Sequence, residues 1–177
     1  MRRCAECNRA VRPHELAERC FRFPYRLTAA ARELYPVIVQ LGEWGMRWAR
    51  GQMSELDLDV GMLMEDVQRR IDPSKLPTGQ TVLRFKFTDL PKYADWWVKI
   101  DDDEMDLCLE DPGHDIDVYF TSDLRTMIEV WMGDISIKDA ELQSRLKIVA
   151  PPTYRKNLQA WLPLHGMAGI RPARQVA

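Results

Sequence analysis

Between residues 81 and 122, apolar and polar residues alternate with a period of two in four successive segments. This period is typical of β-strands that bury one face, because successive side chains of a strand point to opposite sides. The segments are TVLRFKFTD, ADWWVKI, MDLCLED and IDVYFTS, and a fifth short one, LKIVA, follows later. Their close succession predicts a mainly antiparallel five-stranded sheet that is open to water on one face and covered on the other.

Helical periodicity surrounds these strands. Thr28 is a good N-cap for a long helix that contains Pro36 and ends near Gly51, and a second helix is expected over residues 55–71. After the strands, Ser122 or Asp123 and then Ser136 are expected to cap short helices, and Pro152 to open a final one. The chain is therefore expected to be α+β, with a long N-terminal helical arm and helices over one face of the sheet.

Charge is distributed unevenly along the chain. Residues 1–50 hold ten arginines against five acids, whereas residues 51–150 hold eleven basic residues against 22 acids. Such segregation indicates a boundary near Gly51. We expect three parts: residues 1–52 with the long helix, residues 53–163 with the sheet, and residues 164–177 as a flexible tail.

Several classes of protein are disfavoured by what the sequence contains. Its apolar runs are all well short of the about 18 residues that a membrane span needs. The first sixteen residues have a basic end without the apolar stretch of a signal peptide, so a cytoplasmic location is expected. The sequence has three histidines and neither a G-x-S-x-G motif nor a phosphate-binding loop. We therefore expect no enzymatic activity and no cofactor.

Possible metal ligands gather near the N-terminus. Cys4 and Cys7 form a C-x-x-C pair, and His14 and Cys20 follow. Three thiolates and one imidazole are a ligand set that structural zinc accepts. Reduced thiols without metal are the other interpretation, since only one such pair is present.

An apolar layer is expected between the sheet and its covering helices. It is either a filled core or the lining of a cavity for an apolar molecule, with methionine as an adaptable wall, and periodicity alone does not separate these interpretations. The candidate lining residues are Phe85, Phe87, Trp97, Met105, Leu107, Phe120, Met127, Ile128 and Trp131.

The long helix carries a second apolar surface. Leu41, Trp44 and Trp48 are too apolar to remain exposed to solvent on the long helix. Gly45 allows the backbone of a second helix to approach closely. These four residues predict a homodimer through the helix.

Residues 24–48, PYRLTAAARELYPVIVQLGEWGMRW, resemble the closing part of HxlR-type winged-helix regulators, in which a wing strand leads into a long dimerisation helix. Fewer than 25 residues precede this stretch, too few for the helix-turn-helix and recognition helix of that family. The resemblance implies at most weak, sequence-indifferent contacts of Arg22, Tyr25 and Arg26 with DNA phosphates.

Residues 111–151 resemble the sterol-carrier-protein-like (type two) lipid-binding domain, and the resemblance extends more weakly over about residues 55–163. The matching positions are Asp123, Leu124, Trp131, Gly133, Ser136, Ala140, Arg145 and Leu146. Met127 stands where the family has a second Leu, and Ser144 where it has Gly. The resemblance implies a sheet with helices on one face that encloses an apolar tunnel for fatty-acyl or sterol-like ligands.

Together, the two resemblances favour part of a transcriptional regulator whose sheet domain binds an apolar effector. A stand-alone lipid-binding or carrier module, or a dimerisation module without DNA binding, are the alternatives.

Overall fold

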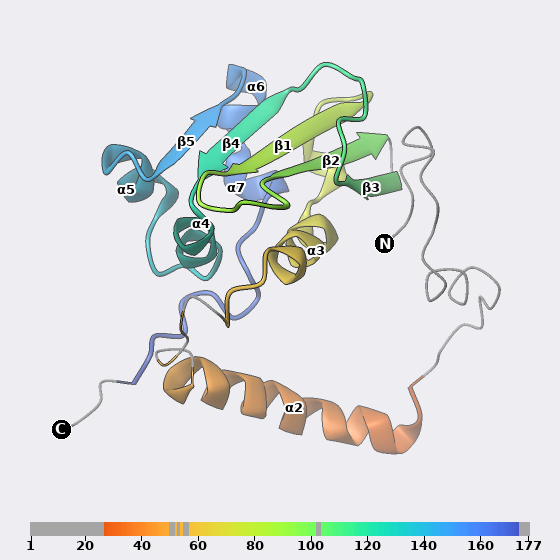
Figure 1. The fold of residues 1–177 in the computed structure, drawn as a ribbon. Helices are drawn as coiled ribbons and strands as arrows, with labels where there is room; N and C mark the ends of the chain where they lie inside the picture. The colour runs from red at the N-terminus through yellow and green to blue at the C-terminus, as the bar shows by residue number, and fades with distance from the viewer. Residues whose placement is uncertain (1–26, 50–51, 53, 55–56, 102–103, 174–177) are drawn as a thin grey trace. The chain divides into compact units, whose positions relative to one another are not determined.

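The computed structural model describes residues 27–49, 52, 54, 57–101 and 104–173. Their contacts divide the chain into two units, which are described separately (Figure 1). Leu58–Ala168 form the sheet unit. The second unit contains helix α2 (Ala29–Trp48) and the described residues from Gly169 onward.

The sheet unit has five strands in the order β3-β2-β1-β4-β5. Strands β1 and β4 run parallel, and the other neighbouring pairs are antiparallel. This confirms the α+β class and the mainly antiparallel five-stranded sheet. The strands are β1 (Thr81–Phe87), β2 (Asp95–Asp101), β3 (Glu104–Cys108), β4 (Val118–Ser122) and β5 (Leu146–Val149).

The helices of this unit are short, and their caps follow from the sequence. Asp123 caps α4 and Ser136 caps α5, because each side chain accepts a backbone N–H of the first turn. Gly133 follows α4 with a φ of 75°, which glycine adopts readily. The helical segments are α3 (Val60–Arg70), η3 (Pro73–Lys75), α4 (Leu124–Trp131), α5 (Ile137–Leu142), α6 (Pro152–Arg155) and α7 (Leu158–Trp161).

The single final helix expected from Pro152 onward is wrong, because the chain forms two short helices there. Asn157 leaves helical geometry, with φ −110° and ψ 20°, between α6 and α7. The Trp161 indole then donates to the backbone carbonyl of Tyr154 at 2.9 Å and holds α7 against the end of α6.

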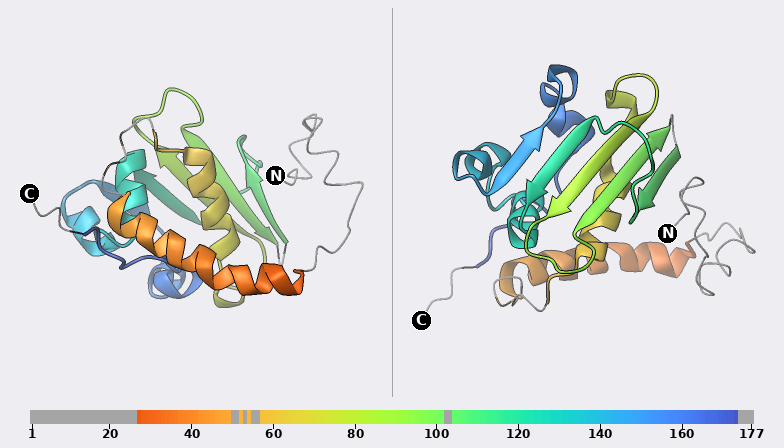
Figure 2. Two further views of the ribbon diagram at one scale, coloured as in Figure 1. Left: turned by 90° about the horizontal axis from the view of Figure 1, so that it is seen from below. Right: turned by 45° about the horizontal axis from the view of Figure 1, so that its top comes forward.

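The main core lies on the inner face of the sheet. Residues of α3, α4 and α7 pack there with the inward-pointing residues of β1, β2, β3 and β4 into one cluster. Figures 1 and 2 show these helices beside the sheet. The rings of Phe85 and Phe120 stack at its centre, with centroids 4.5 Å apart. Burial of these apolar surfaces is the principal force that holds helices to the sheet.

The alternation of residues predicted that the opposite face of the sheet is open to water. In the structure, part of this face is covered. Val82, Trp97 and Cys108 are buried there, with Ile116 packed against them. The chain from β3 to β4 crosses this face on its way over β2 and β1 (Figure 2, right). The crossing is required because β4 pairs with β1 on the side away from β2.

The conformation of Ser144 leads to a stability prediction. It has a φ of 58°, at the position where the sterol-carrier-like motif has glycine. Since a side chain in this region costs about 1 kcal/mol, Ser144→Gly should raise the free energy of unfolding by about that amount. Urea denaturation measures the change. Gln143→Gly is the control: its φ is −82°, so the same substitution should destabilise. Equal effects at the two positions would contradict the account.

In the second unit, α2 begins as expected. The Thr28 hydroxyl accepts the Ala31 N–H at 3.1 Å. At the other end, the Ala173 N–H donates to the carbonyl of Arg47 at 2.7 Å. A C-terminal segment therefore satisfies one of the carbonyls that the last turn of a helix leaves without an intrahelical partner.

Candidate functional site

The apolar layer between the sheet and the helices contains eight of the nine residues expected there. They belong to the main core cluster or pack against it. The eight are Phe85, Phe87, Met105, Leu107, Phe120, Met127, Ile128 and Trp131. That they line a ligand site stays a prediction.

The ninth residue, Trp97, does not face this layer, so its assignment to the lining is wrong. Trp96 points into the core instead. Neighbouring residues of a strand point to opposite faces, and the register sets Trp97 beside Arg84 and Cys108. The Arg84 guanidinium lies 5.4 Å from the centre of the Trp97 ring. The Trp97 indole N–H is buried and has no hydrogen-bond partner within the described part of the chain.

The layer also contains residues that sequence reasoning did not assign to the site. Met64 and Val67 of α3 are fully buried in it, as is Trp161 of α7. Met64 and Val67 are three residues apart in the helix expected over residues 55–71, so they share a helix face, but the spacing does not indicate what that face covers. Trp161 meets the edges of two rings, Phe120 at 6.4 Å and Tyr154 at 6.5 Å.

One polar pair within the unit is deeply buried. The hydroxyls of Thr81 and Tyr154 lie 3.2 Å apart. Burial raises the pKa of Tyr154, while the hydrogen bond with Thr81 acts in the opposite direction and nearby Asp117 adds to the rise. The phenol therefore stays neutral at physiological pH, and the two hydroxyls share one hydrogen bond in which either can be the donor.

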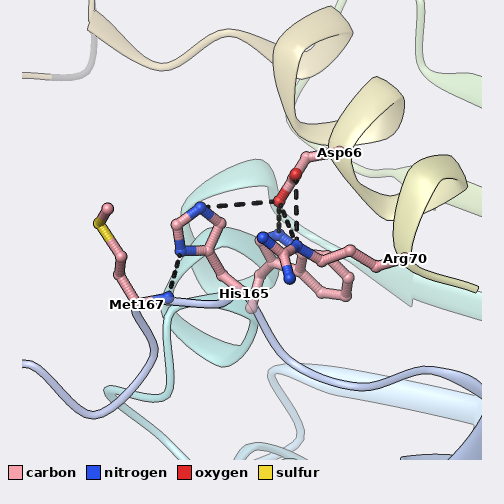
Figure 3. Close-up of polar contacts among 5 residues, drawn as sticks. Asp66, Arg70, His165 and Met167 are labelled. Carbon is pink, nitrogen blue, oxygen red and sulfur yellow. Dashed lines mark hydrogen bonds and ion pairs between the residues drawn. The ribbon is translucent and has the colours of Figure 1, made fainter. Parts of the chain in front are cut away.

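A second polar cluster, centred on Asp66, joins three segments of the sheet unit (Figure 3). The Trp131 indole of α4 donates to Asp66 Oδ2 of α3 at 2.8 Å. Arg70 Nε lies 3.3 Å and His165 Nε2 3.8 Å from the same oxygen. The Met167 N–H donates to His165 Nδ1 at 3.1 Å, and the His165 N–H to the Trp131 carbonyl at 3.0 Å. Asp66 thus holds residues 165–167 against α3 and α4.

The motif residue Arg145 connects α4 to the start of β5. Its Nε donates to the Thr126 hydroxyl at 3.1 Å, and its guanidinium pairs with Glu129. Thr126 in turn donates to the cap residue Asp123 at 2.6 Å. These contacts link Asp123 and Arg145, which are 22 positions apart in this chain, through the hydroxyl of Thr126.

The Asp66 cluster leads to a second prediction. Asp66→Ala leaves the buried Trp131 N–H without its acceptor, so the free energy of unfolding should fall by about 1–3 kcal/mol in urea denaturation. Glu65→Ala is the control, because Glu65 pairs with the exposed Arg69 at 2.9 Å. Removing that pair should cost less than about 0.5 kcal/mol. A cluster without structural importance would make the two variants equally stable.

Several expected sites lie outside the described residues. These are the cluster Cys4, Cys7, His14 and Cys20 and the phosphate contacts Arg22, Tyr25 and Arg26. Within residues 27–49, 52, 54, 57–101 and 104–173, no group of three or more His, Cys, Asp or Glu is placed to hold a metal ion. In the same residues, no helix has the length and apolar content to cross a membrane.

Comparisons with known proteins bear on the fold. No model of a protein family and no curated protein sequence matches this chain. Among solved structures, the stereoselective inverting sec-alkylsulfatase Pisa1 from Pseudomonas sp. is similar over 63% of this chain, with 15% identity and a TM-score of 0.50. The match covers only 17% of the alkylsulfatase chain. At this identity, the likeness shows a shared α+β fold over the matched part and nothing of its activity.

Two further similar structures are smaller proteins. Sterol Carrier Protein 2 Like 2 from Aedes aegypti is 18% identical, with 57% of this chain and 94% of that chain covered and a TM-score of 0.41. The UbiJ-SCP2 ubiquinone synthesis protein is 14% identical, with 58% and 87% covered and a TM-score of 0.43. The winged-helix resemblance of residues 24–48 stays a prediction.

Proposed function

We propose that residues 58–168 form a binding module for an apolar small molecule, of fatty-acyl or sterol-like type, between the inner face of the sheet and helices α3, α4 and α7. The observation that carries the proposal is the composition of this layer. Three methionines, Met64, Met105 and Met127, meet large aromatic rings there. Unbranched methionine side chains change rotamer at low cost, so they can move aside for an acyl chain or a ring system.

The sequence resemblance supports the same proposal. The residues that match the sterol-carrier-like motif build the wall next to this layer: Asp123 caps α4, Trp131 anchors to Asp66, and Arg145 ties β5 to α4. These contacts tie α4 to α3 and to the start of β5. On the α3 side, Met64 leaves the layer adjustable.

A fluorescence titration tests the proposal. A polyene fatty acid, which emits weakly in water and strongly in apolar surroundings, should gain emission with the protein and lose it when palmitic acid or cholesterol competes. The module as proposed has one saturable site, so unlabelled competitors should displace the probe completely. Emission that never saturates, or that resists both competitors, would count against a specific site.

A second function is favoured by the surface of α2. None of its residues is buried, and large apolar side chains are exposed along its length. We propose that α2 self-associates and serves as the dimerisation arm of a cytoplasmic transcriptional regulator, with the sheet unit as its effector domain. Weak, salt-sensitive contacts of Arg22, Tyr25 and Arg26 with DNA phosphates are part of this proposal.

Self-association has a direct test. Light scattering of the full chain at micromolar concentration should return the mass of a dimer. Leu41→Glu, at a position that is 64% exposed, should return a monomer and leave the fold intact, because most of that side chain is exposed among the described residues. The control is Arg32→Glu, a charge change elsewhere on α2. A monomer mass for the unmodified chain would refute this second function and leave the first unaffected.

A further inference from the structure

We propose that α2 pairs with α2 of a second copy in an antiparallel arrangement, with Leu34 of one helix opposite Trp44 of the other. The inference rests on the self-association proposed above and names its geometry. Three observations carry it: the spacing of the exposed apolar residues, their sizes, and the charges beside them.

Five of the seven exposed large apolar residues of α2 follow a heptad, and Tyr35 and Ile38 lie outside it. Leu34, Leu41 and Trp48 recur every seven residues, and Val37 and Trp44 lie three residues after the first two. All five side chains are more than half exposed. This is the spacing of the first and fourth heptad positions, the seam along which two helices pack side by side. Ala30, also exposed, extends the seam by one position towards the N-terminus.

The sizes of these residues favour antiparallel pairing. In that arrangement Ala30 meets Trp48 of the second copy, Leu34 meets Trp44, and Val37 meets Leu41. Each layer then combines a smaller with a larger side chain, which keeps the distance between the helix axes even. A parallel pair would place Trp44 and Trp48 against their own copies at one end and two alanines at the other.

The charges favour the same orientation. Glu33 and Arg47 each lie one residue before a first heptad position, on the same border of the seam at opposite ends. Antiparallel pairing brings Glu33 of each copy beside Arg47 of the other, so that two ion pairs form. In a parallel pair Glu33 would instead lie beside Ile38 of the other copy and Arg47 beside Gln52, neither of which carries a charge. Arg47 has only a loose partner on its own helix, Glu43 at 3.8 Å.

Gly45 fits this arrangement. Among the described residues, a Cβ built at this position meets nothing within 4 Å, so no described neighbour in its own unit requires glycine there. It lies next to Trp44, and the missing side chain leaves room for the second helix to approach the indole.

Cysteine cross-linking tests the orientation. In a full chain whose four native cysteines are changed to serine, Leu34→Cys and Trp44→Cys variants are mixed and oxidised. A disulfide needs Cα atoms within about 7 Å, so we expect a cross-linked dimer containing one chain of each kind. Leu34→Cys alone should give none, because its two copies lie ten residues apart along the pair, or roughly 15 Å.

Charge exchange provides a second readout. Glu33→Arg or Arg47→Glu alone should weaken the dimer roughly tenfold in analytical ultracentrifugation, since each places like charges together at both ends. The double variant should recover most of the affinity. A Leu34→Cys homodimer, or a double variant no better than the single ones, would overturn the antiparallel geometry while leaving self-association standing. A monomeric unmodified chain would overturn both, and neither result touches ligand binding by the sheet unit.

Discussion

Met127→Lys is expected to lower the free energy of unfolding by more than about 4 kcal/mol. Met127 is only 3% exposed and lies in the apolar cluster between α4 and the sheet. A lysine there must either bury an unpaired charge or push α4 away from the sheet, and both are costly. Urea denaturation followed by far-UV circular dichroism measures the loss.

The matched control for this prediction is Met62→Lys. Met62 belongs to α3 and is 73% exposed, so its change to lysine should stay within about 0.5 kcal/mol of the unmodified chain. A second variant keeps the question of ligand binding separate from folding. Met127→Leu preserves volume and should cost less than about 1.5 kcal/mol, while its stiffer side chain weakens binding of the polyene fatty acid. If both lysine variants were equally stable, the position assigned to Met127 would be wrong.

Trp161→Ala is expected to cost about 3–5 kcal/mol in the same measurement. Trp161 is fully buried, contacts Phe120 and Tyr154 edge-on, and donates its indole N–H to the Tyr154 carbonyl. Its removal leaves a large cavity and an unsatisfied carbonyl. It also detaches α7 from α6, since the indole bond spans the break at Asn157.

Two controls accompany Trp161→Ala. Trp161→Phe keeps an aromatic ring but loses the hydrogen bond, so it should fall between the alanine variant and the unmodified chain. Leu142→Ala, at a position that is 74% exposed, should change stability by less than about 0.5 kcal/mol. A Trp161→Ala chain as stable as Leu142→Ala would contradict the packing of α7 on the sheet.

Local rules were sufficient for much of the fold. Alternation with a period of two located all five strands, since each buries one face against helices. Side-chain capping located the starts of α2 and α5 at Thr28 and Ser136 and narrowed the start of α4 to Ser122 or Asp123, of which the structure has Asp123, because the cap is a contact within three residues. The assignment of Trp97 to the inner face was wrong although the pattern favoured Trp96, since Trp96 shares its face with Val98 and Ile100, and Trp97 shares its face with Lys99.

Features that depend on distant residues were not predictable in this way. The parallel pairing of β1 with β4 sends the connection between β3 and β4 over the outer face, where Ile116 of this connection packs against the cluster of Val82, Trp97 and Cys108. The partner of Asp66 on α4 is 65 residues away, and His165 is further still. A lone aspartate on the polar side of a predicted helix carries no signal for either contact.

The residues of the apolar layer also divide into those that local patterns predicted and those that depend on distant parts of the chain. Strand and helix periodicity identified eight of its residues, because each pattern reports which side of its own element is buried. It did not identify Met64 or Trp161 as their neighbours, since that depends on how α3 and α7 dock onto the sheet. Whether the layer opens for a ligand depends on the relative free energies of a filled and an occupied state, which no periodicity encodes.

Native mass spectrometry of the purified full chain with palmitic acid and cholesterol tests the central claim most directly. We predict one bound ligand for each chain, retained in the unmodified protein and in Met62→Lys and reduced in Met127→Leu. Because binding displaces water from apolar walls, the same complex should also show altered indole emission, since Trp96, Trp131 and Trp161 all belong to the layer. A chain that folds as described and retains neither ligand at any concentration would contradict the account and leave the layer a filled core.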